Sequence, residues 1–134
     1  MMENNLFISL RSETGIKIGG NTTKLMDGNI IFVVSEGDQT NELAIQQQKM
    51  IRKVAESLVG KVNYLIDINR CGKNAPGARS IWKSISEDQK TRKVATYGMN
   101  PVAKIIASFI IKSYNKNNLR FFTTKEEALK WIKE

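Results

Sequence analysis

The spacing of hydrophobic residues divides the chain into two parts, a β-rich opening and a longer part in which helical and strand patterns alternate. Short apolar runs separated by turn residues fill the opening; they are residues 6–11, 15–18, 22–26 and 30–34. Gly19, Gly20 and Asn21 together, and the pair Asp27 and Gly28, are typical of turns. We therefore expect residues 1–35 to form a β-meander of two to four short strands, with the clearest strand at residues 30–34.

From residue 36 onward, helical and strand patterns alternate. Residues 35–38 predict a polar loop, and helical spacing follows over residues 40–60, 76–86, 101–114 and 123–134. Strand patterns lie between these helices at residues 62–68, 93–97 and 119–122. This alternation favours parallel strands joined by right-handed crossovers. We expect one α/β domain over residues 1–134, with a meander at 1–35, an alternating part at 36–134, four to five strands in a mixed sheet, and four helices.

The stretch of residues 64–79 is where we expect function. A buried strand ends near Ile68, a polar crossover follows, and a helix restarts at Pro76. In α/β proteins, the loop after a central strand commonly carries the site. Backbone amides and the helix start there could bind an anion. The side-chain candidates for this site are Asp67, Asn69, Arg70, Lys73 and Arg79. The alternative is a plain crossover loop with Asp67 as a capping or salt-bridging residue.

The residue types available exclude most enzyme chemistry. One cysteine and no histidine rule out an internal disulfide and histidine-based catalysis. Cys71 has basic neighbours that favour its thiolate but no base to activate it. The pair Gly72 and Lys73 lacks the other residues of a phosphate-binding loop. No paired acids or metal set is visible, so we expect no enzyme activity, no metal and no cofactor.

Positive charge is concentrated in the second half of the chain. The net charge is +8; residues 1–67 carry 7 Lys/Arg and 8 Asp/Glu, whereas residues 68–134 carry 14 and 5. A basic half can attract an acidic protein, an anionic membrane or nucleic acid; the alternative is a solvated lysine-rich surface. Residues 1–10 have no signal-peptide pattern, and the apolar run at 105–111 is far shorter than the ~20 residues of a membrane span. We expect a cytoplasmic protein.

The helix predicted from Pro101 is apolar around much of its circumference. Such a helix is buried or presents a surface to something else. We expect it to pack in the core and form a dimer or partner interface; the alternatives are the wall of a cavity for a lipid-like ligand, or contact with a membrane surface. The residues that we expect at this interface or cavity are Ile81, Trp82, Ile85, Val102, Ile106, Phe109 and Ile110.

Several phrases of residues 30–134 resemble the STAS superfamily of anti-sigma-factor antagonists. The phrases are a strand ending in Ile66 and Asp67, a basic strand at 92–97, the helix phrase at 100–109, and Phe-Thr-Thr-Lys-Glu-Glu-Ala-Leu-Lys-Trp-Ile at 122–132. The resemblance implies a mixed sheet with helices mainly on one face. It also implies a regulatory or ligand-binding role more than catalysis.

One departure from the superfamily bears on mechanism. Antagonists that work by phosphorylation carry an Asp-Ser-Ser/Thr-Gly motif where a helix begins after the central strand. Here residues 74–79 contain no hydroxyl, and Ser80 comes about a turn late. We therefore expect a non-catalytic regulatory or interaction module, as a homodimer, that binds a regulatory protein or a small apolar or anionic ligand.

Two other functions stay open at this point. One is a phosphorylation-dependent antagonist that uses Ser80, Ser84 or Ser86. The other is a binder of lipid or of acidic surfaces, for which membrane and nucleic acid are the less expected partners.

Overall fold

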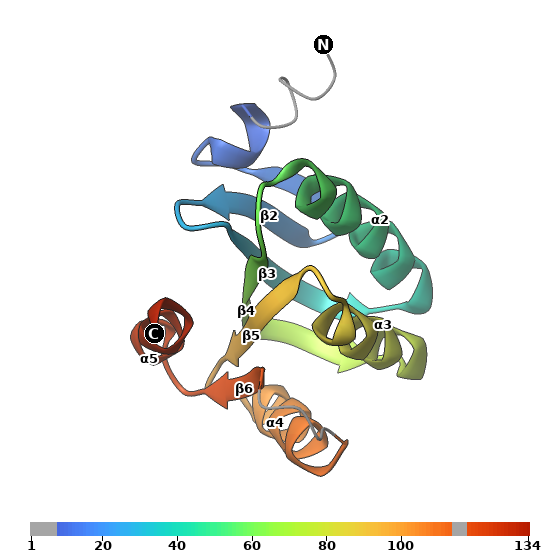
Figure 1. The fold of residues 1–134 in the computed structure, drawn as a ribbon. Coiled ribbons are helices and arrows are strands. Elements are labelled where there is room, and N and C mark those ends of the chain that lie inside the picture. The colour runs from blue at the N-terminus through green and yellow to red at the C-terminus, as the bar shows by residue number, and fades with distance from the viewer. Residues whose placement is uncertain (1–7, 114–117) are drawn as a thin grey trace.

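One six-stranded sheet forms the centre of the molecule (Figure 1). The computed structural model describes residues 8–113 and 118–134, except for the side chains of residues 109–113. The strands are β1 (Ile16–Ile18), β2 (Asn21–Met26), β3 (Ile30–Gln39), β4 (Val62–Asn74), β5 (Thr91–Tyr97) and β6 (Leu119–Phe122). The helices are α2 (Asn41–Ser57), α3 (Pro76–Glu87), α4 (Pro101–Ser113) and α5 (Lys125–Lys133).

The strands lie in the sheet in the same order as in the chain. β1, β2 and β3 form an antiparallel meander, and β3 to β6 are parallel. The meander and the parallel crossovers are therefore confirmed, but the expected four to five strands are wrong, because the sheet has six. β1 has only three residues, too few for a reliable period-two pattern.

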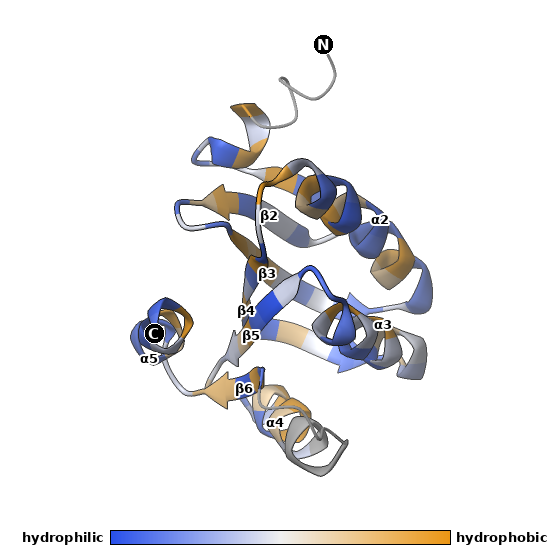
Figure 2. Cartoon of the chain, viewed as in Figure 1, coloured by the Kyte–Doolittle hydropathy of each residue, from blue (hydrophilic) through white to orange (hydrophobic). Residues whose placement is uncertain are grey.

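The helices cover the two faces of the sheet unequally. α2, α3 and α4 lie on one face and α5 lies on the other (Figure 1). Tyr64 and Ile66 of β4 belong to the core under the first three helices, whereas Leu65 packs in a second core with Trp131 of α5. A strand buried on both faces has a continuous apolar sequence. Figure 2 shows this hydrophobic colouring in the strands and on the inner sides of the helices.

The strand pattern at residues 6–11 is wrong in the part that the structure describes. Residues 8–11 form a short helix, and residues 6 and 7 lie outside the described residues. The expected four helices are therefore also wrong, because the described residues contain five. Leu10 is fully buried in the core under α2, whereas Ile8 is largely exposed. Leu10 is buried in the core from a helical turn. The apolar residues of this segment therefore do not indicate a strand paired with β1.

The two loops expected at residues 35–38 and 69–75 are largely strand. β3 and β4 continue side by side beyond the rest of the sheet, with Glu36 opposite Arg70 and Gln39 opposite Asn74. We name residues 35–39 and 69–74 the β3–β4 ribbon. Two register shifts interrupt it, and Gly37 between them has φ +73°, a conformation that glycine adopts without strain. Only Ala75 separates β4 from α3.

Helix starts follow the capping rules. The Thr40 side chain accepts a hydrogen bond from Leu43 N at 3.1 Å, and Thr124 accepts one from Glu127 N at 3.3 Å. Pro76 occupies the first turn of α3, where its missing N–H costs nothing. The helix boundaries expected from these residues are confirmed within about three residues at each end.

Buried amides join the meander to α2. Asn21 Nδ2 donates to Gln39 Oε1 at 2.8 Å, and Gln39 Nε2 donates back to Asn21 Oδ1 at 3.1 Å. Gln47 of α2 donates to Thr23 Oγ1 at 2.8 Å. A fully satisfied buried network of this kind favours one arrangement of the strands, and it holds the start of the β3–β4 ribbon.

Candidate functional site

A cavity of about 70 Å³ lies between the sheet, α3 and α4. Its walls come from the faces of β3 to β6 that are covered by α3 and α4. The lining residues are Ser35, Gln39, Ile66, Ile68, Cys71, Asn74, Arg79, Trp82, Lys83, Val94, Thr96, Ile106 and Leu119. Most of its surface is hydrocarbon. The space holds several water molecules or a slender apolar group, and we name it the α3–α4 cavity.

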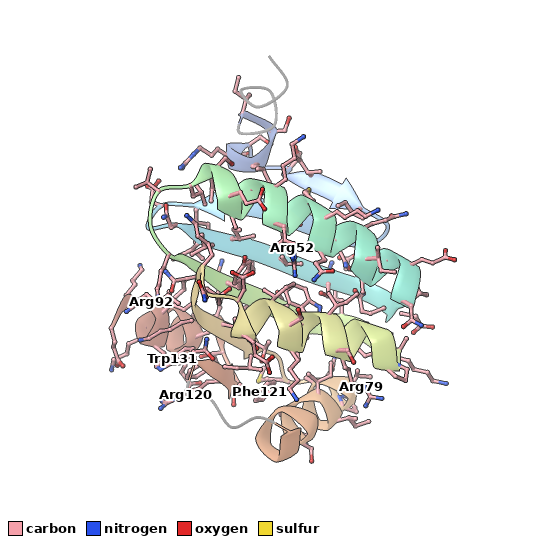
Figure 3. The ribbon with its side chains drawn as sticks, turned by 45° about the vertical axis from the view of Figure 1, so that its right-hand side comes forward. Arg52, Arg79, Arg92, Arg120, Phe121 and Trp131 are labelled. Carbon is pink, nitrogen blue, oxygen red and sulfur yellow. The ribbon has the colours of Figure 1, made fainter. Side chains whose placement is uncertain are left out.

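Helical spacing brings three α3 residues to the cavity. Arg79, Trp82 and Lys83 line it, and positions three and four apart share one face of a helix. Figure 3 shows Arg79 between α3 and α4. Trp82 is half-buried and Lys83 is exposed, so the aromatic ring contributes to the wall and the two cationic residues mark one side of it.

The polar side chains in the wall make internal hydrogen bonds. Gln39 is paired with Asn21, Asn74 Nδ2 donates to Cys71 Sγ at 3.3 Å, and Thr96 Oγ1 donates to Arg120 O at 3.4 Å. These groups do not require a ligand for satisfaction. The interior is therefore suited to apolar contact, and the cationic side is suited to an anionic end.

The thiol in this wall is a neutral group. Cys71 is 5% exposed, and burial raises its pKa, as does the nearby Asp38, against a smaller lowering by the Asn74 bond. A neutral buried thiol is a weak nucleophile. The structure therefore gives Cys71 the role of an apolar wall residue.

Asp67 and Asn69 lie in a hydrogen-bond network in the middle of β4, beside the carboxyl end of β5. Asp67 accepts from Asn69 N at 2.9 Å and from Tyr97 Oη at 3.1 Å, and burial together with Asp67 raises the Tyr97 pKa. Asn69 Oδ1 accepts from Met99 N at 3.0 Å, and Asn100 Nδ2 donates to Asn69 O. Asn100 Oδ1 also accepts from Ala103 N at 2.6 Å, so this network positions the start of α4.

Arg70 and Lys73 lie along the β3–β4 ribbon and do not line the cavity. Arg70 Nη1 pairs with Glu36 Oε1 at 3.1 Å, and Lys73 N donates to Asp38 Oδ1 at 2.9 Å. Of the five anion candidates, only Arg79 lines the α3–α4 cavity. The five therefore do not converge on one point.

The amino end of α3 is tightly packed. Ala75 makes no side-chain capping bond. A Cβ added to Gly77 would overlap the Asn41 side-chain amide at the start of α2, with Asn41 Nδ2 at 3.3 Å. The starts of α2 and α3 thus abut, which leaves little room for an anion at the helix start.

Two of the seven apolar candidates line the cavity, namely Trp82 and Ile106. Ile85 belongs to the core under the helices and Ile81 packs against it, while Val102 is half-buried on α4. The side chains of Phe109 and Ile110 lie outside the described residues.

Sequence reasoning missed the strand residues of the wall. Ser35, Val94, Thr96 and Leu119 line the cavity from three parallel strands, β3, β5 and β6, that are brought together only in the folded sheet. The period-two alternation of these strands shows which residues of one strand share a face of the sheet. It does not show which strands are neighbours, so it could not bring these residues together.

The three serines of α3 differ in exposure. Ser80 and Ser84 are exposed, whereas Ser86 is 1% exposed and donates to Lys83 O at 2.6 Å. Ser80 Oγ donates to Pro76 O at 3.1 Å within the helix. Phosphorylation stays a prediction, with Ser80 and Ser84 as its accessible positions.

Metal-ligand clusters and membrane-spanning helices are both absent from the part of the chain that the structure describes. Residues 8–113 and 118–134 contain no group of three or more His, Cys, Asp or Glu residues placed to hold a metal ion. Within the same ranges, no helix combines the length and the apolar character required to cross a membrane.

The fold is similar to two solved structures. One is an uncharacterised protein of the DUF3478 family with a SpoIIAA-like fold from Shewanella loihica PV-4: identity is 15%, the TM-score is 0.64, and the match covers 88% of this chain and 98% of that one. The other is the anti-sigma factor antagonist SpoIIAA in its unphosphorylated form: identity is 9%, the TM-score is 0.62, and the match covers 84% and 97%.

These likenesses establish a SpoIIAA-like, STAS-like fold and confirm the resemblance seen in the sequence. The comparison with curated proteins gave no match. The family model of a domain of unknown function, DUF7793, matches residues 24–134. This STAS-like chain therefore belongs to the DUF7793 family.

Proposed function

We propose that the protein is a non-catalytic regulatory module that binds a small apolar anion in the α3–α4 cavity. One observation carries this proposal: an apolar space has two cationic residues, Arg79 and Lys83, on the same side. Ligand sites of this kind combine hydrophobic walls with a few polar groups that fix orientation. A short hydrocarbon chain ending in a carboxylate has the complementary chemistry.

The position of the cavity gives ligand binding a route to regulation. Ile106 of α4 and Leu119 of β6 form part of the wall, so a molecule in the cavity contacts both α4 and β6. A ligand shifts a conformational equilibrium only when it contacts the two states differently. We propose that occupancy changes the position of α4 and thereby the surface offered to a partner.

A regulatory protein partner and a homodimer belong to the same proposal. The similar SpoIIAA is an anti-sigma factor antagonist, which supports a protein partner for this chain. Ile105 on α4 and Met99 just before it are 67% and 65% exposed. Exposed apolar side chains can form part of an interaction surface, and we propose the exposed side of α4 at Ile105 as the contact.

The two tryptophans allow a direct test of ligand binding. Trp82 lines the cavity, whereas Trp131 packs on the opposite face of the sheet. The Trp131→Phe variant retains only Trp82, and its tryptophan fluorescence should change on titration with decanoate. The Trp82→Phe variant retains only Trp131, and its fluorescence should stay unchanged. Native mass spectrometry of freshly purified protein would show any molecule already retained.

Decanol is the matched probe for the charge. It has the same chain without the carboxylate, so Arg79→Gln/Lys83→Gln should weaken decanoate binding roughly tenfold and leave decanol binding within about twofold. The proposal fails if neither probe changes Trp82 emission, or if both tryptophans respond equally.

A further inference from the structure

An open hollow of about 600 Å³ lies at the amino ends of the parallel strands, away from the α3–α4 cavity. Its walls are the β2–β3 turn, the connection between α2 and β4, the start of β5 and the end of α5. Three of its residues are cationic, namely Lys61, Arg92 and Lys133. We name this feature the basic hollow.

Two more cations lie beside the basic hollow, around Trp131. Lys93 Nζ is 4.9 Å and the Arg120 guanidinium carbon 5.2 Å from the centre of the Trp131 ring. Figure 3 shows Arg92, Arg120 and Trp131 on the same side of the molecule. Burial, Arg92 and Arg120 lower the Lys93 pKa, against an opposing effect of Glu134. Burial is the larger cause, and the contributions of Arg92 and Arg120 show that the positive charges lie close together here.

Few carboxylates offset these five cations. Asp27 lines the basic hollow but pairs with Arg11 at 3.2 Å, and Glu134 lies near Lys93. Neither of the two ion pairs among the described residues involves Lys61, Arg92, Lys93, Arg120 or Lys133. The surface therefore attracts anions.

The floor of the basic hollow is held in place by hydrogen bonds. Arg92 Nη1 donates to Ile132 O at 2.7 Å and to Asn63 Oδ1 at 3.2 Å. Asn29 Nδ2 donates to Val59 O at 2.7 Å. Both Arg92 bonds use one terminal nitrogen, and a guanidinium has five N–H donors. Donors thus remain for a ligand without loss of these contacts.

Some of the five cations cap the carboxyl end of α5, and others do not. Arg92 and Lys93 donate to carbonyl oxygens in the last turn of α5, where cations are stabilising. Lys61 reaches the same hollow from the α2–β4 connection, and it makes no such contact. Val59 beside it is 94% exposed, which adds an apolar contact at the rim.

We propose that the basic hollow is a docking site for an acidic, partly apolar segment of a partner protein. A concave surface receives protruding carboxylate side chains, whereas a bilayer surface requires a convex or flat one. Single-stranded nucleic acid binds by stacking bases on exposed aromatic rings, and Trp131 is only 7% exposed. An acidic protein segment is thus the occupant that fits both shape and charge.

Charge reversal at two exposed lysines tests this site. Lys61 and Lys133 are exposed, so Lys61→Glu/Lys133→Glu should fold normally. Lys49→Glu/Lys53→Glu makes the same change in net charge on exposed positions of α2. The probe is a short fluorescein-labelled peptide of Asp, Glu and one Leu, measured by fluorescence anisotropy. A second peptide with Asn and Gln in place of the acids is its control.

We expect the hollow variant to bind the acidic peptide at least ~10-fold more weakly than the wild type, and the α2 variant to bind within ~2-fold. Equal weakening in both variants would mean that net charge alone is responsible, and would overturn the site. Tighter binding to phosphatidylserine vesicles or to a single-stranded oligonucleotide than to the peptide would overturn the acidic protein partner. Decanoate titration of the same variants is expected to be normal, which separates this result from the cavity proposal.

Discussion

Gly72 lies in the β3–β4 ribbon, where its missing side chain allows β4 to lie close to Gly37 and Asp38 of β3. A Cβ there would overlap Asp38 Oδ1 and lie 3.0 Å from both Asp38 N and Gly37 C. The last two neighbours are backbone atoms, which cannot rotate away. A side chain at position 72 would push the two strands slightly apart, so the glycine favours the β3–β4 ribbon and, through it, the position of Cys71 and Asn74 in the cavity wall.

We expect Gly72→Ala to lower the free energy of unfolding by ~1–3 kcal/mol, the usual cost of overpacking. Lys73→Ala is the control, because the Lys73 side chain is exposed and such changes stay within ~0.5 kcal/mol. Urea denaturation followed by circular dichroism measures both. Equal stability of the two variants would contradict the close approach at Gly72.

At the scale of elements, the connection between β6 and α5 depends on one threonine. Thr124 Oγ1 accepts a hydrogen bond from Glu127 N, and it also lies 3.0 Å from the Glu127 carboxylate. This reciprocal contact stabilises the first turn of α5. Among the described residues, α5 is the helix that covers this face of the sheet in Figure 1, so its stability also protects the core around Trp131.

Thr124→Ala should lower the free energy of unfolding by ~1 kcal/mol through loss of the cap. The neighbouring Thr123 is exposed and does not cap the helix, so Thr123→Ala should have a smaller effect. Thermal unfolding measured by Trp131 emission in the Trp82→Phe background reports on α5 directly. Identical midpoints for the two threonine variants would argue against the cap.

The helices and the central strands were predictable because local residues encode them. Pro76 and Thr124 each stand at the start of a helical pattern, where these residue types favour a helix start. The run at residues 62–68 is apolar at nearly every position, which is typical of a buried strand. The β3–β4 ribbon was not predictable. Its residues are polar or glycine, and its stability comes from contacts between distant positions such as Glu36 and Arg70, which no local pattern records.

At the scale of the whole molecule, the candidate site was also predictable only where local residues determine it. The sequence placed Arg79 among the anion candidates of the crossover and Trp82 and Ile106 among the apolar candidates of two helices, and these three line one cavity. It also grouped Asp67 and Lys73 with Arg79, although Asp67 accepts a hydrogen bond from Tyr97 and Lys73 lies on the ribbon. Proximity along the chain cannot tell which face of a strand a residue occupies when the strand continues past its apolar part.

The proposed homodimer can be tested with a single charge. Ile105 is 67% exposed on α4, and Ile45 is 45% exposed on α2. If the α4 side forms the contact, Ile105→Glu should shift sedimentation from dimer to monomer, because a buried carboxylate is costly at an interface. Ile45→Glu should leave it unchanged. A wild-type protein that sediments as a monomer at high concentration would exclude the dimer.

The packing of Gly77 against Asn41 has a consequence for evolution. Any side chain at position 77 competes with the one at position 41 for the same space. A descendant that acquired a serine at position 77 would displace the end of the Asn41 side chain, which is exposed and can rotate away. The residues at the two positions are therefore expected to co-vary among relatives, with either one free to change first.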